Sequence, residues 1–226
     1  MTLKVKINTL LHFKKFGSST MLTAPAAERN KGPILEVIQR FYPQNFVGKA
    51  LEIASGTGSH VIHFASNFPN ITFQPSECNP RNLHSIVAHV DHFRLENVRV
   101  PLFIDVAQSP DRWALPADFG PSSLDLMVNV NMLHISSNSA VEGLFRSAEG
   151  LLKTGGRLFV YDAFGREGRI TPESNVRFNE SLKRENPEWG LRFIEDLSDL
   201  ALRHSLILTD VFEMPAHNHT LVFQKQ

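Results

Sequence analysis

The stretch "LEIASGTGSH", residues 51–60, decides the fold. An apolar run carrying the acid Glu52 leads into a turn that contains Gly56 and Gly58, and apolar residues at helical spacing follow. Because glycine has no Cβ, such a turn lets the backbone approach a ligand, and the free N–H groups of the next helix then face that ligand. The stretch therefore predicts a strand, a ligand-binding turn and a helix. A tight turn that binds nothing is the alternative.

Strand-like and helix-like segments alternate on both sides of this turn. Five strands are expected at residues 49–54, 70–75, 97–106, 123–133 and 157–164. Helices fall between them, which is typical of a parallel doubly wound sheet with right-handed crossovers. The last two strands, residues 205–214 and 218–225, are joined by a turn so short that they form an antiparallel pair. The sequence therefore predicts an α/β fold: a Rossmann-like doubly wound seven-stranded sheet, mostly parallel with an antiparallel terminal strand, and helices on both faces.

Two helix boundaries are expected from proline and glycine. Residues 24–41 are expected to form a loop followed by a helix with Pro33 in its first turn, where the missing N–H of proline costs nothing. Arg29 and Asn30 would then lie in the loop. The helix at residues 140–153 is expected to end at the run Thr154-Gly155-Gly156.

Composition argues against several classes of protein. Lys plus Arg and Asp plus Glu both number 23 in 226 residues, and this zero net charge argues against a protein that coats nucleic acid. No apolar run approaches the roughly 20 residues of a membrane span, so no membrane partner is expected. The only cysteine is Cys78, which favours a reducing, cytoplasmic setting.

The first 20 residues differ from the rest, because they contain four lysines and no acid. We interpret residues 1–20 as a basic, flexible extension ahead of a single domain at residues 21–226. A mitochondrial presequence is the alternative, although such segments are usually rich in arginine. Met21 is a second candidate for the start of translation.

The residues around the glycine turn separate three kinds of nucleotide ligand. A dinucleotide fingerprint needs a third small residue where this chain has Val61, and a P-loop needs a Gly-Lys-Ser/Thr run that the turn lacks. Glu52 would repel a pyrophosphate, but it would suit a ligand that carries an ammonium group, such as S-adenosylmethionine. A nicotinamide-dependent oxidoreductase is therefore disfavoured.

Two further acids follow the next two strands. Glu77 comes about 20 residues after Gly58, a spacing at which a carboxylate can bind ribose hydroxyls. Asp105 ends the third strand, where it would meet the adenine amino group. A solvated surface position is the alternative for each acid, but together with Glu52 they lie at consecutive strand ends, where ligands bind. This set predicts S-adenosylmethionine as the cofactor.

The chain resembles the class I S-adenosylmethionine-dependent methyltransferases in "LEIASGTG", "PSECNP", "FIDV", "LDLMVNVNMLH" and "LLKTGGRLFVYD". In more specific segments, including "AAERNKGPIL" and "NPEWGLR", it is similar to an uncharacterised family that includes vertebrate methyltransferase-like protein 26. This second resemblance spans residues 21–226. It implies the fold and the cofactor, but it implies no reaction.

The resemblance also implies further cofactor residues. Ala54 stands where the class has the first glycine of its acid-x-Gly-x-Gly-x-Gly motif. Asn129 and Asn131 would be wall residues near the methionine part of the cofactor, and Arg29 and Asn30 would cover it from the N-terminal loop. The Asn/Asp-Pro-Pro-aromatic motif of many amino-group methyltransferases is absent after the fourth strand, so methylation of amino groups has no support.

Candidates for the acceptor pocket come from strand ends and from the polar segment after the fifth strand. They are Asn131, His134, Tyr161, Asn186 and Trp189. His134 and Tyr161 are also the catalytic candidates, since a base is needed where the acceptor must lose a proton. A capping or packing histidine is the alternative for His134, and a core tryptophan is the alternative for Trp189.

No metal site is expected, because no third ligand accompanies His60 and His63. His217 and His219 are expected in a turn and at the start of a strand. We therefore predict a methyltransferase that uses S-adenosylmethionine. The acceptor is a small molecule or a protein side chain, and the short polar segment and the neutral charge favour the small molecule. The alternative is a catalytically silent S-adenosylmethionine-binding or interaction protein on the same fold.

Overall fold

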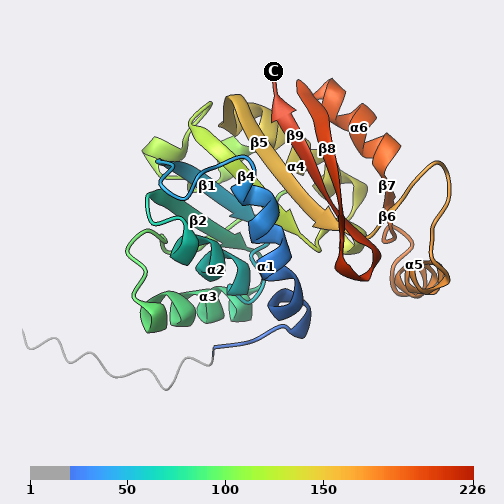
Figure 1. Cartoon of the computed structure of the whole chain (residues 1–226), viewed down its shortest axis with the longest axis horizontal. Coiled ribbons are helices and arrows are strands. Elements are labelled where there is room, and N and C mark those ends of the chain that lie inside the picture. The colour runs from blue at the N-terminus through green and yellow to red at the C-terminus, as the bar shows by residue number, and fades with distance from the viewer. Residues whose placement is uncertain (1–20) are drawn as a thin grey trace, which may run out of the picture.

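Seven strands form the main sheet of the protein in the computed structural model, which describes residues 21–226 (Figure 1). The expected basic extension, residues 1–20, lies outside the described residues. In chain order the strands are β1 (Gly48–Ile53), β2 (Ile71–Glu77), β3 (Leu102–Phe103), β4 (Leu124–Val130), β5 (Leu152–Asp162), β8 (Leu206–Met214) and β9 (Asn218–Lys225).

The strands lie in the order β3–β2–β1–β4–β5–β9–β8. All neighbouring pairs from β3 to β5 are parallel, whereas β9 is antiparallel to both β5 and β8. The last strand of the sequence is therefore an interior strand, and β8 forms the edge. The expected α/β fold is confirmed as a mostly parallel, seven-stranded sheet with an antiparallel terminal strand.

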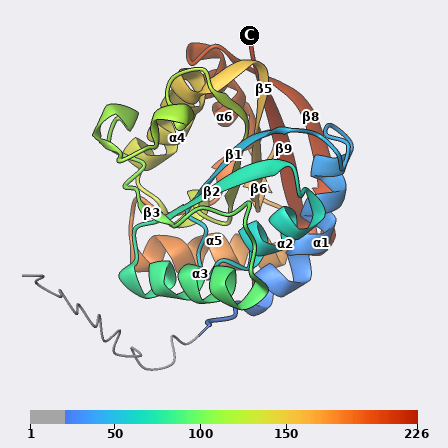
Figure 2. The same ribbon diagram turned by 90° about the vertical axis from the view of Figure 1, so that its left-hand side faces the viewer.

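Helices cover both faces of this sheet (Figures 1 and 2). The longer helices are α1 (Pro25–Gln39), α2 (Ser59–Asn67), α3 (Pro80–Phe93), α4 (Asn138–Leu151), α5 (Glu173–Glu185) and α6 (Ile194–Arg203). One apolar core joins the sheet to α1, α2 and α3, and a second core joins its other face to α4 and α6. None of the helices within residues 21–226 is both long and apolar enough to cross a bilayer.

The order of the strands reverses between β1 and β4. From β1 the chain crosses to β2 and then β3 on one side, whereas β4 and β5 lie on the other side. In open α/β sheets this reversal opens a crevice at the carboxyl ends of the two strands, and ligands bind there. A ligand site is therefore expected at the turn after β1 and the loop after β4.

The N-terminal helix begins eight residues earlier than Pro33. α1 starts at Pro25, which occupies the first helical turn, and Pro33 lies inside the helix. The expected loop at Arg29 and Asn30 is therefore wrong, and both residues belong to α1. Pro33 has no N–H to donate to the carbonyl of Arg29, but the buried face around Ile34 keeps the helix on the sheet.

Two further boundaries differ from the expected ones. α4 ends at Leu151, and the run Thr154–Gly156 belongs to β5 instead of ending the helix. Leu152 pairs with Leu124 at full burial, and the register shifts before the next pair, so the glycines sit in a bulge of the strand. The third strand is also shorter than expected, because Pro101 interrupts it and leaves only β3 at the sheet edge.

A second sheet of two strands follows β5. β6 (Phe164–Gly165) pairs in parallel with β7 (Arg192–Phe193), which directly precedes α6. The polar segment between them, in which helical patches are expected, contains α5. The pairing of β6 with β7 brings the end of that segment back to the carboxyl end of β5.

Candidate active site

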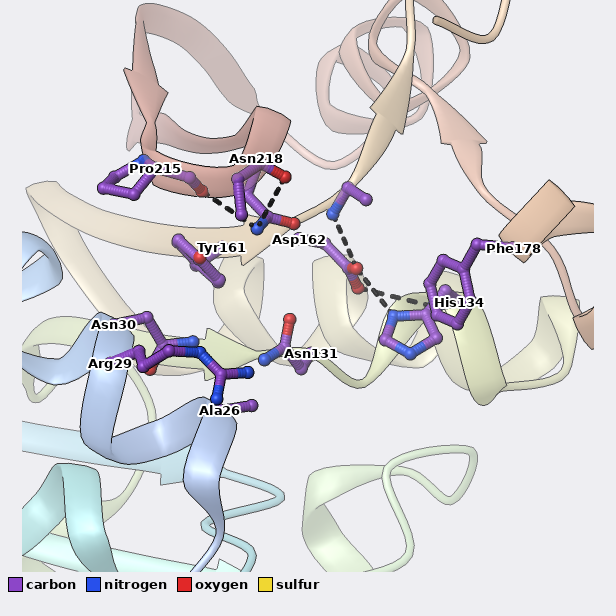
Figure 3. Close-up of a pocket in the computed structure, with 12 residues that line it drawn as sticks. Ala26, Arg29, Asn30, Asn131, His134, Tyr161, Asp162, Phe178, Pro215 and Asn218 are labelled. Carbon is purple, nitrogen blue, oxygen red and sulfur yellow. Dashed lines mark hydrogen bonds and ion pairs between the residues drawn. The ribbon is translucent and has the colours of Figure 1, made fainter. Parts of the chain in front are cut away.

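Two adjoining cavities open at the carboxyl ends of β1, β2, β4 and β5. The first, which we call the glycine-turn cavity, has a volume of about 520 Å³ and lies against residues 54–57, 77–79 and 130–132. The second, the His134 cavity, has a volume of about 400 Å³ and is lined by α1, α5 and the ends of β4, β5 and β8 (Figure 3). Ala26 and Asn131 line both, so the two cavities adjoin.

Glu77 holds the glycine turn against the end of β2. Its Oε2 accepts a hydrogen bond from the N–H of Gly56 at 2.8 Å. Its Oε1 accepts from the N–H groups of Cys78 at 2.8 Å and Asn79 at 3.1 Å. An ionised carboxylate has about four lone-pair sites, so Glu77 retains one for a ligand in the glycine-turn cavity that it lines.

The two glycines of the turn have different roles. Gly56 lines the cavity with a left-handed φ of 55°, and a Cβ built there would meet open space. A ligand can therefore approach its backbone. Gly58 also has a positive φ, but a Cβ there would come within 3.1 Å of the backbone of Ile86 in α3. Gly58 thus permits close packing of α2 on α3 and does not line either cavity.

Ala54 lines the glycine-turn cavity in a conformation that favours glycine. Its φ is 57°, in the left-handed region, where an L-residue pays roughly 1–2 kcal/mol. The departure from the glycine of the methyltransferase motif is therefore accommodated at a cost in strain, with the backbone keeping the shape that a glycine would adopt.

Glu52 and Asn129 are buried in the strands that lead into the cavities and line neither of them. Burial raises the pKa of Glu52 to about 7, and a hydrogen bond with Ser55 opposes the shift less strongly. The Oε2 atom of Glu52 and the Oδ1 atom of Asn129 have no hydrogen-bond partner among the described residues. These two buried oxygen atoms are acceptors next to the glycine turn.

Asp105 lies outside both cavities. Its side chain is exposed, and its Oδ1 accepts a hydrogen bond from the N–H of Ala107 in the turn after β3. The predicted contact with an adenine amino group therefore has no direct support from the cavity walls.

Asn30 and His60 connect the two cavities. Asn30 lines the His134 cavity, His60 lines the glycine-turn cavity, and 2.7 Å separates Asn30 Oδ1 from His60 Nε2. Because the amide oxygen only accepts, His60 Nε2 donates, and burial lowers the pKa of His60 to about 4. His60 is therefore neutral at pH 7, with Nδ1 as an acceptor. Among the described residues, His60 and His63 are part of no three-residue metal-ligand group.

His134 and Asp162 form a buried pair at the ends of β4 and β5 (Figure 3). Asp162 Oδ1 lies 2.6 Å from His134 Nδ1 and also accepts from the N–H of Ala163 at 2.8 Å. The Asp162 side chain is 2% exposed and that of His134 is 13% exposed. A carboxylate at Nδ1 fixes the proton there, so Nε2 carries the lone pair on the side facing the cavity. This is the arrangement of a general base held by an acid.

Arg192 fixes the loop that carries His134. Its guanidinium donates to the carbonyls of Leu133 at 3.3 Å and Ser136 at 2.5 Å, and to Oδ1 of Asn138 at 2.7 Å. These contacts span both sides of His134. β7 supplies Arg192, so the pairing of β6 with β7 positions the base through this side chain.

Segment 186–190 contacts His134 through its backbone only. The N–H of Gly190 donates to the carbonyl of His134 at 2.9 Å. Asn186 and Trp189 line neither cavity: Asn186 Oδ1 accepts from the N–H of Glu188, and Trp189 packs against a small apolar cluster. The structure does not bring these two predicted acceptor residues to the site.

Tyr161 lies across the His134 cavity from α1. Burial raises the pKa of its hydroxyl, and the side chains of Asn30 and Asn218 nearby oppose this less strongly. The phenol therefore stays protonated near neutral pH and acts as a hydrogen-bond donor. Phe178 of α5 closes the opposite side, with its ring edge-on to His134 at 5.2 Å between centroids.

Residues 21–225 match the protein family described as "Protein of unknown function (DUF938)". The chain belongs to the DUF938 family.

Solved structures of methyltransferases share the fold of this DUF938 chain. An O-methyltransferase family protein from Burkholderia thailandensis has a TM-score of 0.73 at 16% identity, over 89% of this chain and 57% of that one. The mitomycin 7-O-methyltransferase MmcR has a TM-score of 0.72 at 15% identity, over 89% and 54%. CalO1, a methyltransferase in calicheamicin biosynthesis in its SAH-bound form, has a TM-score of 0.67 at 13% identity, also over 89% and 54%.

The DUF938 chain thus spans a little more than half the length of these three proteins. At such low identities the likeness establishes a shared fold. What these proteins bind is a property of each of them, and the chemistry of the DUF938 site depends on its own residues.

Several residues of the site are absent from the sequence-based set. They are Ala26, His60, Phe178, Arg192 and Asn218. Phe178 and Arg192 belong to the polar segment and its return strand, whose position depends on contacts distant in sequence.

Proposed function

We propose that this protein transfers a methyl group from S-adenosylmethionine to a hydroxyl group of a small molecule. The observation that carries the proposal is the pair of adjoining cavities, which share Ala26 and Asn131, with a His–Asp pair facing one and a glycine turn facing the other. Methyl transfer needs donor and acceptor aligned in one enclosed space. The resemblance to the family of methyltransferase-like protein 26 agrees with this proposal.

The residues of the glycine-turn cavity fit the cofactor. Gly56 leaves open space for close approach, and Glu77 has a lone pair left for a ribose hydroxyl. Glu52 lies behind the cavity wall and not in it, and its buried, unpartnered Oε2 is the acceptor that we assign to the ammonium group of the cofactor. When bound, S-adenosylmethionine supplies an electrophilic methyl group on a sulfonium.

The His134 cavity supplies the acceptor side. His134 Nε2 accepts the proton of the acceptor hydroxyl, and Asp162 stabilises the imidazolium that results. Tyr161 and Asn131 offer hydrogen bonds that orient the acceptor. The cavity volume of about 400 Å³ suits a small molecule.

Calorimetry with the purified full chain tests the cofactor half of the proposal. S-adenosylmethionine and S-adenosylhomocysteine should bind, and NAD should not. Glu77→Gln should weaken binding about tenfold or more, because it removes a charged acceptor from the cavity wall. Glu96→Gln, an exposed change of the same chemistry outside both cavities, should leave binding unchanged. Absence of binding by the wild-type chain would overturn the proposal.

Transfer of a labelled methyl group into a small-molecule extract tests the enzymatic half. A labelled product that withstands base hydrolysis is not a methyl ester, and release of its label as methyl iodide by hydriodic acid supports transfer to a hydroxyl. Cofactor binding without any labelled product across extracts would favour the alternative, a catalytically silent binding protein on this fold.

A further inference from the structure

The His134 cavity contains one cationic side chain without a counterion. Arg29 is the only arginine or lysine among the described residues that line it. Figure 3 shows its guanidinium pointing from α1 into the cavity toward Asn131. Arg29 is exposed, and no ion pair or hydrogen bond joins its side chain to any residue in the described part of the chain.

Two acids, the chain neighbour of Arg29 and the acid that lines the same cavity, are already engaged. Glu28, its neighbour in the chain, forms an ion pair with Lys31 away from this cavity. Asp162, the acid that lines the cavity, binds His134 Nδ1 and the N–H of Ala163. The guanidinium of Arg29 is therefore available for an anion that residues 21–226 do not provide.

The remaining walls define the body of a ligand. Phe178, Pro215 and Ala163 give the cavity an apolar side, and Asn131 and Asn218 give it amide groups. Such a lining suits a small ring or chain with one polar end. Arginine presents a planar fork of donors that binds a carboxylate through two parallel hydrogen bonds.

We propose that the acceptor is a small hydroxylated organic acid, whose carboxylate pairs with Arg29 while its hydroxyl lies at His134 Nε2. This inference rests on the proposed methyl transfer and names its substrate class. Arg29 lines the His134 cavity but not the glycine-turn cavity, so it serves the acceptor and not the cofactor as first expected.

The transfer leaves the carboxylate unchanged. The hydroxyl proton passes to His134 Nε2, a bond forms between the hydroxyl oxygen and the methyl carbon, and the methyl–sulfur bond breaks with its electron pair going to sulfur. The products are a methoxy acid, S-adenosylhomocysteine and a proton.

Binding of matched acids and amides tests the inference without any need for turnover. Isothermal titration in the presence of S-adenosylhomocysteine compares para-hydroxybenzoate, hydroxyphenylpropionate and hydroxyhexanoate with the primary amide of each. At least one acid should bind about tenfold or more tightly than its amide, since a charge-assisted hydrogen bond is lost in the amide. Equal binding of every acid and its amide, or no binding by any acid, overturns the inference.

Arg29→Gln removes the charge and should abolish the preference for the acid over its amide. Lys31→Gln, a loss of the same charge two residues away and outside the His134 cavity, should keep that preference. Both variants should bind S-adenosylhomocysteine as the wild type does. Loss of that binding in Arg29→Gln alone would assign Arg29 to the cofactor and overturn the inference.

The charge of the natural product distinguishes this inference from the proposed function. Labelled product from an extract should be retained by an anion-exchange resin at neutral pH. A labelled product that is neutral or cationic overturns the inference and leaves methyl transfer intact. Failure of the wild-type chain to bind S-adenosylhomocysteine overturns both.

Discussion

Asp162 Oδ1 lies 2.6 Å from His134 Nδ1 and joins the end of β5 to the turn that follows β4. The distance therefore depends on the β4–β5 pairing and on Arg192, which fixes the turn that carries His134. Asp162 Oδ1 also accepts a hydrogen bond from the N–H of Ala163, which holds the carboxylate in this orientation.

Replacing Asp162 with Asn tests this relationship. The amide keeps the size of the side chain but no longer favours the tautomer with the proton on Nδ1, so kcat should fall by about 100-fold or more. Affinity for S-adenosylhomocysteine, measured by calorimetry, should stay within about twofold. An unchanged kcat would show that the pair is structural.

His134→Gln removes the base itself. We expect kcat to fall by a factor of about 10²–10⁴, the usual contribution of a general base. The exposed His84, which lines neither cavity, provides the matched control in His84→Gln. Equal activity of the two variants in a labelled-methyl assay would argue against His134 as the base.

Arg192→Lys keeps a positive charge but loses the fork that binds the His134 loop. We expect kcat to fall about tenfold with little change in cofactor affinity, because the loop shifts while the glycine-turn cavity stays intact. The pH dependence of kcat should keep its shape, since the base is the same group. A proportional loss of cofactor binding would instead indicate a general structural defect.

Glu52 makes stability fall as the pH rises. Its pKa is raised to about 7 in the folded protein from an ordinary 4.5, so over this interval the unfolded chain loses the proton while the folded chain keeps it. Glu52→Gln should therefore gain stability relative to the wild type between pH 4.5 and 7, by roughly 3 kcal/mol at the top of the range. Urea unfolding at several pH values measures this difference, and a gain that does not vary with pH would contradict the assignment.

His60 has the opposite effect over nearly the same interval. Its pKa is lowered to about 4 from 6.5, so stability falls as the pH falls through this window. His60→Gln should gain relative stability toward pH 4, with the amide nitrogen still able to donate to Asn30. In the wild type, the opposite effects of Glu52 and His60 on the pH dependence of stability largely cancel between pH 4.5 and 6.5. Each variant should therefore show the pH dependence that comes from the other residue.

Ala54→Gly should relieve backbone strain in the glycine turn. A left-handed φ of 57° costs alanine roughly 1 kcal/mol, and glycine avoids this cost. Part of the stability gained in this way is lost again, because glycine is more flexible in the unfolded chain. We expect the free energy of unfolding to rise slightly or stay constant. Ala140→Gly, in the helical conformation of α4, should lower it by about 1 kcal/mol. A clear loss in Ala54→Gly would contradict the strain.

The parts of the fold set by local patterns could be predicted from the sequence. The apolar residues of β1, the glycines after it and the buried face of α2 lie close together in the chain, and their pattern alone predicts strand, turn and helix. The position of Glu77 beside the turn could be predicted for the same reason, because one helix and one strand fix its distance from the turn along the chain. The structure adds that Glu77 also holds the N–H of Gly56.

The parts set by distant contacts could not be predicted. The sequence does not determine the start of α1, because Pro25 and Pro33 both suit a first helical turn and only packing on the sheet distinguishes them. Arg192 reaches the His134 loop because β7 pairs with β6, a contact for which two residues give no periodic signal. The wall of the His134 cavity formed by α5 depends on the same return of the chain.

The floor and the walls of the His134 cavity come from different kinds of structure. Asp162 and Tyr161 belong to the interior strand β5, whose hydrogen-bond ladders leave them little freedom, and Arg192 fixes the turn that carries His134. Arg29 and Phe178 project from α1 and α5. Substitutions in those helices can change which molecule fits without disturbing the reacting groups. Under the proposed function, natural variation at these helix positions would change the acceptor while the reacting groups stay the same, and directed evolution for new acceptors would best begin there.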